Sequence, residues 1–252
     1  MRKRILFLLA HPDDETFGTG GTIARYARSG AEVHLATATR GEAGMVGDPP
    51  VTDREHLGEV RAAELMAAAE ILGIAKVHFL GFIDGKLANV PREQLVEAAV
   101  ELIRRVRPHI LVGFGPEGVS RHADHMVMSE VALTAFGRAA DPTWYPGDGA
   151  PWAPFKLYQF EIAQELLAGW DAPLAGVPRT KLTAFIDTTE QVETKIRAFH
   201  CHKTQAKDTR RILERPGYRE FARQETYVLA RTRLPGLPLP EDDLLAGIPD
   251  DH

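Results

Sequence analysis

The amino-acid sequence predicts an α/β fold with a mainly parallel sheet. Short apolar segments alternate with stretches of helical periodicity through the first half of the chain, which is the pattern of consecutive βαβ units. These apolar segments are rich in branched or aromatic residues and are bounded by glycine or charge, as buried strands are. With 252 residues and 44% hydrophobic composition, the chain can bury a sizeable core within one domain.

The first half of the chain contains four predicted strands, each followed by a helix. The strands are expected at residues 5–10, 32–39, 76–82 and 109–115. The helices are expected at about residues 20–29, 53–72, 91–106 and 124–139. On the second of these helices, the spacing of Val60, Glu64, Ala67 and Ile71 predicts one common face.

The second half of the chain is less regular. A loop rich in proline, glycine and tryptophan is expected over 141–154, where it would cover the pocket or a subunit contact. Strands are expected near 157–162, 182–188 and 226–232, and a helix is expected over about 190–202. The domain is expected to span residues 1–233, and the proline-rich segment 234–252 is expected to be a poorly ordered tail.

Composition and charge exclude several classes of protein. The net charge of -5 provides no basic footprint, so nucleic acid is not expected as a partner. The early apolar run Ile5–Ala10 is too short for a membrane span or for the core of a secretory signal, and we therefore expect a soluble, cytoplasmic protein. The single cysteine, Cys201, excludes an internal disulfide and a cysteine-based zinc site. Any metal must therefore be bound by His, Asp and Glu side chains.

Histidine and aspartate side chains follow two of the predicted strands at the point where each strand ends. The first strand is followed by "HPDDE" and the fourth by "GPEGVSRHADH". Because the carboxyl ends of parallel strands form the active crevice of an open sheet, the following residues are expected to converge: His11, Asp13, Asp14, His122, Asp124 and His125. Several like charges that are buried together require a compensating cation. Two histidines and a carboxylate with one open position form the ligand set of a catalytic zinc site, which predicts a divalent metal here.

A catalytic site of this kind needs further groups around the metal. The ion lowers the pKa of a bound water to roughly 7, and a second carboxylate that does not bind the metal takes the proton of this water. The adjacent Asp13 and Asp14 can divide these two tasks. A protonated His122 is a candidate donor to the developing oxyanion, and Asp124 can fix the tautomer of a neighbouring imidazole.

Simpler roles for these motifs are also compatible with the sequence. "HPDD" and "HADH" are each typical of a helix start, where an aspartate caps the first turn. The glycines of "GTGGT" suggest a dinucleotide-binding loop, but "HPDDETF" separates them from the first strand, and the second strand ends in "ATATRG" without an acidic residue. His34, His78 and His109 lie within predicted strands and are expected to be core or surface residues.

Six segments match, in order along the chain, the motifs of one known family. They are "AHPDDE", "GTGGTIARYARSGAEV", "TATRGEAG", "EVRAAELMAAAEILG", "LGFIDGKL" and "HADH", with a weaker match in "KIRAFHCHKTQ" at 195–205. The chain thus resembles the PIG-L/LmbE-like family of zinc-dependent N-acetylglucosamine deacetylases. This resemblance implies a Rossmann-like three-layer sandwich. It also implies that a zinc-bound water hydrolyses the acetamide of an N-acetylglucosaminyl (GlcNAc) conjugate.

The resemblance further implies a role for each matching residue. His11, Asp14 and His125 would bind zinc, and Asp13 would act as the general base. His122 would stabilise the tetrahedral oxyanion, with Asp124 tuning it. The residues expected to contact the sugar or the aglycone are Arg40, Glu42, Arg61 and Asp84.

Two positions depart from the pattern of the family. The second motif usually reads "HPDH", and Ala123 replaces its proline here, which loosens the turn without removing a ligand. Ser120 stands where some members carry a tyrosine, so His122 would also have to protonate the leaving amine.

The aglycone and the metal are left open by the sequence. A thiol precursor, an oligosaccharide, a lipid-linked sugar and a secondary metabolite are all compatible aglycones. A site of two histidines and one aspartate accepts iron(II), cobalt or nickel as well as zinc. The resemblance is compatible with a homo-oligomer. The alternative function is a non-catalytic carbohydrate- or metal-binding member of the same fold, which release of an amine from a GlcNAc conjugate would distinguish.

Overall fold

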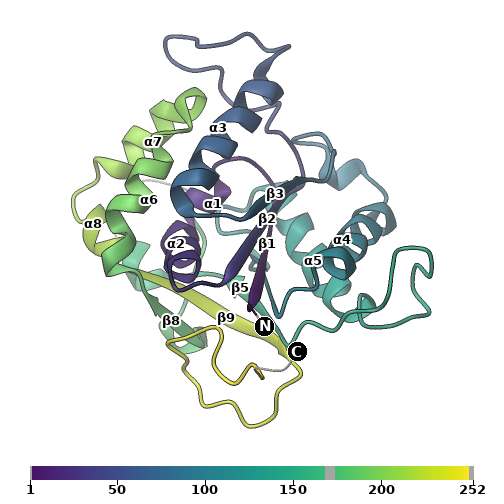
Figure 1. Ribbon diagram of the computed structural model, residues 1–252. Helices are drawn as coiled ribbons and strands as arrows, with labels where there is room; N and C mark the ends of the chain where they lie inside the picture. The colour runs from purple at the N-terminus through teal and green to yellow at the C-terminus, as the bar shows by residue number, and fades with distance from the viewer. Residues whose placement is uncertain (1, 168–173, 250–252) are drawn as a thin grey trace.

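The computed structural model describes residues 2–167 and 174–249 (Figure 1). Its centre is a seven-stranded sheet in the order β3-β2-β1-β4-β5-β9-β8. The strands are β1 (Arg4–Leu9), β2 (Glu32–Thr37), β3 (Lys76–Phe79), β4 (Ile110–Phe114), β5 (Lys156–Phe160), β8 (Ala184–Asp187) and β9 (Gln224–Thr232). Strands β1 to β5 are parallel, and β9 is antiparallel to both β5 and β8. A small separate sheet pairs β6 (Ile162–Ala163) with β7 (Gly176–Val177).

Two groups of helices cover the two faces of this sheet (Figure 1). One group contains α4 (Arg92–Val106) and α5 (Ala123–Arg138), and the other contains α2 (Gly20–Arg28), α3 (Leu57–Leu72) and α6 (Val192–Phe199). The shorter helices are α1 (Asp14–Phe17), α7 (Ala206–Leu213), α8 (Tyr218–Phe221) and the 3-10 turns η1 (Leu87–Asn89), η2 (Gln164–Leu167), η3 (Arg179–Lys181), η4 (Thr189–Gln191) and η5 (Lys203–Gln205). This arrangement confirms the predicted α/β sandwich. None of the described helices has the length and apolar character needed to cross a membrane.

The strand order opens a crevice beside β1 and β4. From β1 the chain moves outward through β2 to β3, and it then returns to the other side of β1 with β4. Where the strand order reverses in this way, the loops after the two strands diverge at the carboxyl edge of the sheet. "HPDDE" follows β1 and "GPEGVSRHADH" follows β4, so the topology brings both motifs to this crevice.

Most of the predicted elements are confirmed with shifted ends. Helix α3 begins at Leu57 rather than at residue 53, because the Asp53 carboxylate accepts the His56 N–H at 2.9 Å and holds a turn before the helix. Ala67, which the sequence assigns to the common face of this helix, is exposed. Other corrected ends include Thr37 for the second strand, Phe79 for the third strand, Phe160 for the fifth strand and Phe199 for the helix expected over 190–202.

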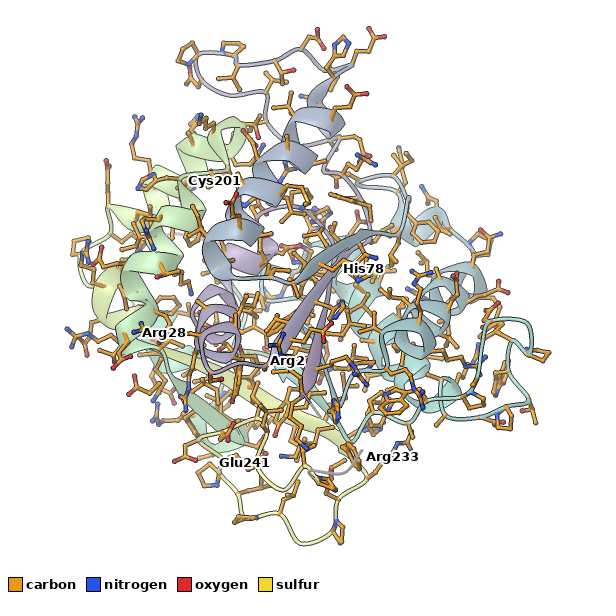
Figure 2. The ribbon with its side chains drawn as sticks, in the orientation of Figure 1. Arg2, Arg28, His78, Cys201, Arg233 and Glu241 are labelled. Atoms are coloured by element: carbon orange, nitrogen blue, oxygen red, sulfur yellow. The ribbon has the colours of Figure 1, made fainter. Side chains whose placement is uncertain are left out.

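The segment after β9 packs against the sheet, so the expectation of a poorly ordered tail is wrong for its described residues, 234–249. Leu244 is fully buried and Glu241 is nearly so. The Glu241 carboxylate pairs with Lys156 of β5 at 2.5 Å and accepts a hydrogen bond from the Tyr158 hydroxyl. Figure 2 labels Glu241 close to β8, with which it forms a bridge at Ala184. A fully buried lysine such as Lys156 requires a carboxylate partner of this kind.

The loop over 141–154 lies at the amino edge of the sheet. The Trp152 indole donates to the carbonyl of Pro108, two residues before β4, at 2.6 Å. The buried Arg104 guanidinium donates to several carbonyls along the loop, including those of Asp141 and Trp144. The expectation that this loop covers the pocket is wrong, because it joins the end of α5 to the start of β5 and therefore lies opposite the crevice.

Candidate metal centre and active site

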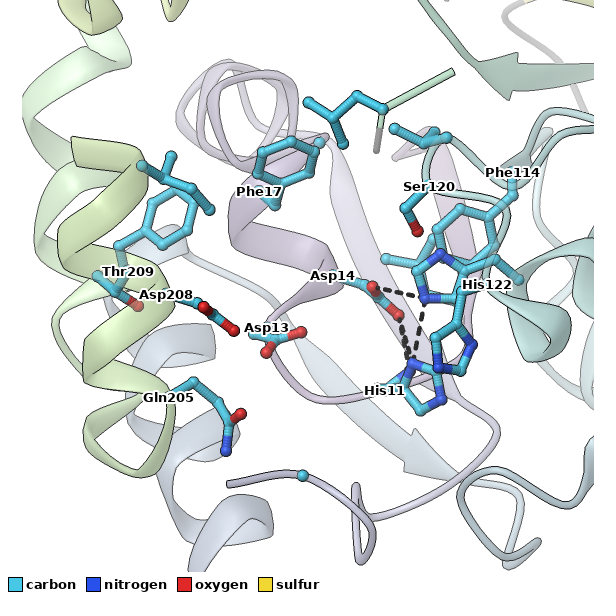
Figure 3. Close-up of a pocket in the computed structure, with 18 of the residues that line it drawn as sticks. His11, Asp13, Asp14, Phe17, Phe114, Ser120, His122, Gln205, Asp208 and Thr209 are labelled. Carbon is cyan, nitrogen blue, oxygen red and sulfur yellow. Dashed lines mark hydrogen bonds and ion pairs between the residues drawn. The ribbon is translucent and has the colours of Figure 1, made fainter. Parts of the chain in front are cut away.

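A cavity of about 520 Å³ opens at the carboxyl edge of the sheet (Figure 3). Five of the six histidines and aspartates expected to converge line it: His11, Asp13, Asp14, His122 and His125. The facing wall comes from η5 and α7, with Gln205 and Asp208 across from Asp13 in Figure 3. The cavity therefore joins a segment near the start of the chain and a segment at its middle to a segment closer to its end.

Three side chains converge on one point in this cavity. His11 Nδ1 and His125 Nε2 lie 3.1 Å apart. Asp14 Oδ1 lies 3.2 Å from His125 Nε2, and Asp14 Oδ2 lies 3.6 Å from His11 Nδ1, as the dashed lines in Figure 3 indicate. Two imidazoles and a carboxylate thus meet beside open space, which is the arrangement of a three-ligand metal site.

Hydrogen bonds behind the two imidazoles orient them toward this point. His11 Nε2 lies 2.9 Å from Asp84 Oδ1 and 3.2 Å from Asp124 Oδ2, so in the neutral ring the proton lies on Nε2 and Nδ1 is free to bind a metal. His125 Nδ1 donates to the Gly118 carbonyl at 3.0 Å, so in the neutral ring Nε2 is unprotonated. A carboxylate or carbonyl behind the ring is the usual outer partner of a metal-binding histidine. The atoms that face the common point, two unprotonated nitrogens and a carboxylate, fit a divalent ion such as zinc.

The carboxylates around His11 make the site favourable for positive charge. Burial opposes protonation of His11, but hydrogen bonds to Asp124, Asp14 and Asp84 raise its pKa well above the usual value. Burial would raise the pKa of Asp14, but His125 and His11 lower it well below the usual value. Three carboxylates within reach of two imidazoles therefore favour a cation at their centre.

His122 is the N-cap residue of α5, and its ring lies beside this centre, 4.8 Å from the ring of His11. Its Nδ1 accepts the backbone N–H of Asp124 at 3.2 Å, so the proton of the neutral ring lies on Nε2. Burial and the neighbouring His11 and His125 lower the pKa of His122. These contacts favour the neutral imidazole over the protonated form that the sequence suggests. One ring nitrogen from each of the three histidines lies within 4.8 Å of those of the other two, so His122 can reach a group bound at the centre.

Asp13 adjoins the ligand set but has different surroundings. Its backbone lies in the left-handed region, with φ 99°, which residues other than glycine rarely adopt. Its Oδ2 accepts a hydrogen bond from Arg61 at 3.0 Å, and Arg61 also donates to the carbonyls of Pro12 and Gly41. Burial raises the pKa of Asp13 to about 6, with Arg61 opposing the rise and Asp14 adding to it. A carboxylate with this pKa is suited to accept a proton near neutral pH.

Comparisons with known proteins point to one family. The profile of the PIG-L family, described as GlcNAc-PI de-N-acetylase, matches residues 6–136. The chain belongs to the PIG-L family. It is similar to a 1D-myo-inositol 2-acetamido-2-deoxy-alpha-D-glucopyranoside deacetylase from Rhodococcus jostii, with 36% identity over 81% of this chain and 82% of the relative. A relative of the same name from Geodermatophilus obscurus is 31% identical over 98% of both chains.

Solved structures share the PIG-L fold of this chain at low sequence identity. N,N'-diacetylchitobiose deacetylase from Pyrococcus horikoshii superposes with a TM-score of 0.69 over 89% of this chain and 82% of its own, at 20% identity. GalB, the 4-carboxy-2-hydroxymuconate hydratase from Pseudomonas putida, superposes with a TM-score of 0.67 over 94% and 99%, at 24% identity. These two enzymes catalyse different reactions, so the reaction of a PIG-L protein has to be inferred from its site residues.

The four residues predicted to contact substrate fall into two groups in this PIG-L protein. Arg61 and Asp84 line the cavity, whereas Arg40 and Glu42 are not among the described residues that line it. The Arg40 guanidinium lies 4.7 Å from the centre of the Phe79 ring. Glu42 Oε2 accepts the N–H of Asp84 at 3.2 Å, so it supports a residue of the cavity wall. Contact with a substrate stays a prediction for all four.

The wall formed by η5 and α7 contains residues that the sequence does not predict as part of the site. They are Gln205, Asp208, Thr209 and Ile212. The only signal for them is the weaker match in "KIRAFHCHKTQ", which ends at Gln205. The Gln205 amide accepts the N–H of Met45 at 3.3 Å and donates to its carbonyl at 2.9 Å. Gln205 therefore joins the loop after β2 to this wall.

The glycines of "GTGGT" serve packing and do not hold a dinucleotide phosphate. The Glu225 carboxylate accepts the N–H groups of Gly21 at 2.9 Å and Thr22 at 2.7 Å, at the N-terminus of α2. Lys195 pairs with the same carboxylate at 2.6 Å. A Cβ atom on Gly21 would lie 2.6 Å from Thr188 Cβ, so only glycine fits there. Because the chain's own carboxylate occupies the place where a phosphate would bind, the dinucleotide-binding alternative is excluded.

Proposed function

We propose that this protein is a metal-dependent N-deacetylase that hydrolyses the acetamide of a GlcNAc–inositol conjugate. The observation that carries the proposal is the convergence of His11, Asp14 and His125 beside the second carboxylate of Asp13. Relatives with 31% and 36% identity are named for deacetylation of a GlcNAc–inositol compound, which supports inositol as the aglycone. Water adds OH to the acetyl carbon and a proton to the nitrogen as the C–N bond breaks, so the products are acetate and a free amine.

His11, Asp14 and His125 would hold the metal, with zinc as the expected ion and iron(II) or cobalt as alternatives. When bound, such an ion polarises the acetamide carbonyl and lowers the pKa of water to roughly 7. His122 is also close enough to be a ligand, but its Nδ1 accepts the Asp124 N–H. The Asp124 carboxylate accepts two further backbone N–H groups. We therefore assign His122 and Asp124 to supporting roles rather than to the ligand set.

Asp13 is the general base in this proposal. Its carboxylate takes a proton from the attacking water and later delivers it to the leaving nitrogen. The contact with Arg61 at 3.0 Å orients this carboxylate within the cavity. Because burial and the neighbouring His11 and His125 lower the pKa of His122 and favour its neutral form, delivery from Asp13 replaces the proton transfer from His122 that the sequence suggests.

His122 is the donor to the acetamide oxygen. As this oxygen gains negative charge, the Nε2–H of His122 donates a hydrogen bond to it, and this bond strengthens as the charge develops. Asp124 sets the orientation of the ring through its backbone N–H at 3.2 Å. In this proposal Asp13 transfers the proton, and His122 stabilises the negative charge on the acetamide oxygen.

The test is the release of amine from GlcNAc–inositol by the purified protein. We expect acetate and amine in equal amounts, loss of both when a chelator removes the metal, and recovery when zinc is added. The methyl glycoside of GlcNAc is the matched substrate, and slower release from it would support recognition of inositol. If the metal-loaded protein releases amine from neither compound, the non-catalytic alternative holds and the proposal is overturned.

A further inference from the structure

The unusual backbone of Asp13 is held by contacts outside the cavity. An aspartate at φ 99° persists only where the surrounding structure holds it there. The Asp13 carbonyl accepts the N–H groups of Thr16 at 3.0 Å and Phe17 at 3.1 Å, which starts α1. The N–H of Asp13 donates to Glu15 Oε2 at 2.9 Å. The side chain of Glu15 therefore fixes the peptide that precedes the proposed base.

Glu15 differs from the other carboxylates of this region because it is fully buried and does not line the cavity. Its exposed fraction is 0%, and that of His202 is 1%. Neither residue is among those that line the cavity, whereas Asp13 and Asp14 are. Glu15 Oε1 lies 2.7 Å from His202 Nε2. One carboxylate thus connects the N–H of Asp13 to an imidazole from a distant part of the chain.

His202 is anchored independently of α1, in the segment between α6 and α7. Its N–H donates to the Phe199 carbonyl at 3.1 Å, and its carbonyl accepts the Gln205 N–H at 3.0 Å. The same segment is tied to α3, because Glu64 accepts the N–H and the hydroxyl of Thr204 at 2.8 and 2.6 Å. His202 Nδ1 is buried without a hydrogen-bond partner among the described residues. The side chain of His202 therefore makes its hydrogen bond through Nε2, to Glu15.

We infer that Glu15 and His202 are positioning residues for Asp13, an inference that rests on the proposed role of Asp13 as base. By holding the N–H of Asp13, the pair keeps its backbone in the left-handed region. This conformation directs the carboxylate of Asp13 toward Arg61 and into the cavity. Since both residues are buried outside the cavity lining, they act through Asp13 and not on the substrate.

Two substitutions at His202 separate the hydrogen bond from the volume of the ring. His202→Phe fills the space but cannot donate to Glu15, whereas His202→Gln places an amide N–H close to the position of Nε2. We expect His202→Phe to lower kcat by about 10- to 100-fold with KM changed less than about threefold, and His202→Gln to keep kcat within about threefold, because small misplacements of a catalytic group have effects of this order. Metal content should stay unchanged in both. His200→Gln, at an exposed histidine two residues earlier, is the matched control and should leave kcat unchanged.

A second pair of substitutions covers the case in which His202→Phe does not fold, since it leaves the Glu15 charge buried and unpaired. In Glu15→Gln, the amide can accept from Asp13 and donate to the other tautomer of His202, so the geometry is kept. Glu15→Leu makes neither contact. We expect kcat to be retained in Glu15→Gln and to fall in Glu15→Leu. A folded His202→Phe or Glu15→Leu variant with wild-type kcat would overturn the inference.

A crystal structure of His202→Phe separates this inference from the proposed function. We expect Asp13 to leave the left-handed region and to lose its contact with Arg61, while the three proposed metal ligands stay together. An Asp13 with unchanged φ and an intact contact to Arg61 would contradict the positioning role. If the wild-type protein releases no amine, the proposed function fails, and the conformation of Asp13 in the variant still decides the role of the pair.

Discussion

Asp13 and Asp14 are adjacent in sequence but face different partners. Asp14 faces the imidazoles of His11 and His125, and its Oδ2 also accepts the N–H of His11 at 2.7 Å, so its charged form is favoured. The left-handed backbone of Asp13 turns the carboxylate of Asp13 itself toward Arg61. The sequence predicts that the two acids divide two tasks. It does not reveal the backbone conformation that separates them.

Asp13→Asn is expected to remove most of the turnover and to leave the metal in place. Asparagine tolerates the left-handed backbone as aspartate does, but its amide cannot take a proton. We expect kcat to fall by about 10²- to 10⁴-fold, the usual contribution of a general base. Metal analysis of the same sample should give wild-type content. Loss of the metal would mean that the roles of Asp13 and Asp14 are exchanged.

His11→Ala and His125→Ala are expected to lose the metal itself. Each change removes one of three donors, and the two that are left bind a divalent ion weakly. Dialysis against metal-free buffer, followed by metal analysis, should leave these variants nearly empty while the wild-type protein keeps its ion. His56→Ala, at an exposed histidine, is the control. Full occupancy in either ligand variant would refute the assigned ligand set.

His122→Ala is expected to slow the reaction while the metal stays bound. The variant lacks the donor to the acetamide oxygen, and loss of one such donor lowers kcat by roughly 10²- to 10³-fold. Steady-state kinetics on the GlcNAc–inositol conjugate measure the change. An unaffected rate would remove His122 from the mechanism.

At the scale of elements, the carboxyl group of Glu161 is buried at the carboxyl edge of β4 and β5, where its charged form is unfavourable. Glu161, directly after β5, is 2% exposed, and its Oε2 has no hydrogen-bond partner among the described residues. It lies against Gly115, where a Cβ atom would come 1.7 Å from Glu161 Oε1. Burial, together with the charge of Glu117, raises the pKa of Glu161 to about 7. The end of β5 is therefore stabilised by a proton on Glu161.

Glu161→Gln is expected to stabilise the fold more at pH 8 than at pH 5. The pKa is higher in the folded state, about 7, than the ordinary value of 4.5, so the folded wild type loses stability as the pH rises through this window. The glutamine variant has no carboxyl group to ionise and so avoids this loss of stability, which amounts to roughly 2 to 3 kcal/mol between about pH 5 and pH 8. Urea unfolding of both proteins at the two pH values measures the difference. A stability difference that is independent of pH would contradict the prediction.

The sequence predicts the elements around the site better than the contacts behind it. Apolar runs mark β1 and β4, and polar motifs directly follow them, so the meeting of His11 and His125 follows from the geometry of parallel strands. The contact between Glu15 and His202 has no such signal, because 187 positions separate the two residues and no periodicity relates them. Such contacts depend on how α1 packs against the segment between α6 and α7.

At the scale of the whole molecule, the tail completes the core around β5. The Lys156 ammonium donates to Glu241 and to the carbonyls of Leu244 and Ala246, all of which lie in the segment after β9. In the sequence, Lys156 directly precedes the strand expected near 157–162, and a lysine at such a position is typically exposed. The sequence therefore gives no sign that this lysine is buried and that the proline-rich segment supplies its partner.

Deletion of residues 234–252 is expected to destabilise the protein by about 3 to 5 kcal/mol, because Lys156 loses its carboxylate partner and the buried side chains of Leu244 and Ile248 are lost from the core. Lys156→Met in the shortened chain should recover part of the loss, since an apolar side chain needs no partner. Urea unfolding is measured for the full chain, for the shortened chain, and for each of these with Lys156→Met. The four free energies of unfolding give the coupling free energy between Lys156 and the tail. Equal free energies of unfolding for the full and shortened chains would rule out this role of the tail.

The order in which the site residues occur along the chain has a consequence during synthesis. The side chains proposed to hold the metal all lie within residues 6–136, whereas His202 and Gln205 come after them. A chain emerging from the ribosome would therefore contain all three proposed metal ligands before the residues that support the neighbouring Asp13 have been translated. The correct placement of Asp13 would thus depend on the last third of the chain, although its own codon is among the first to be read.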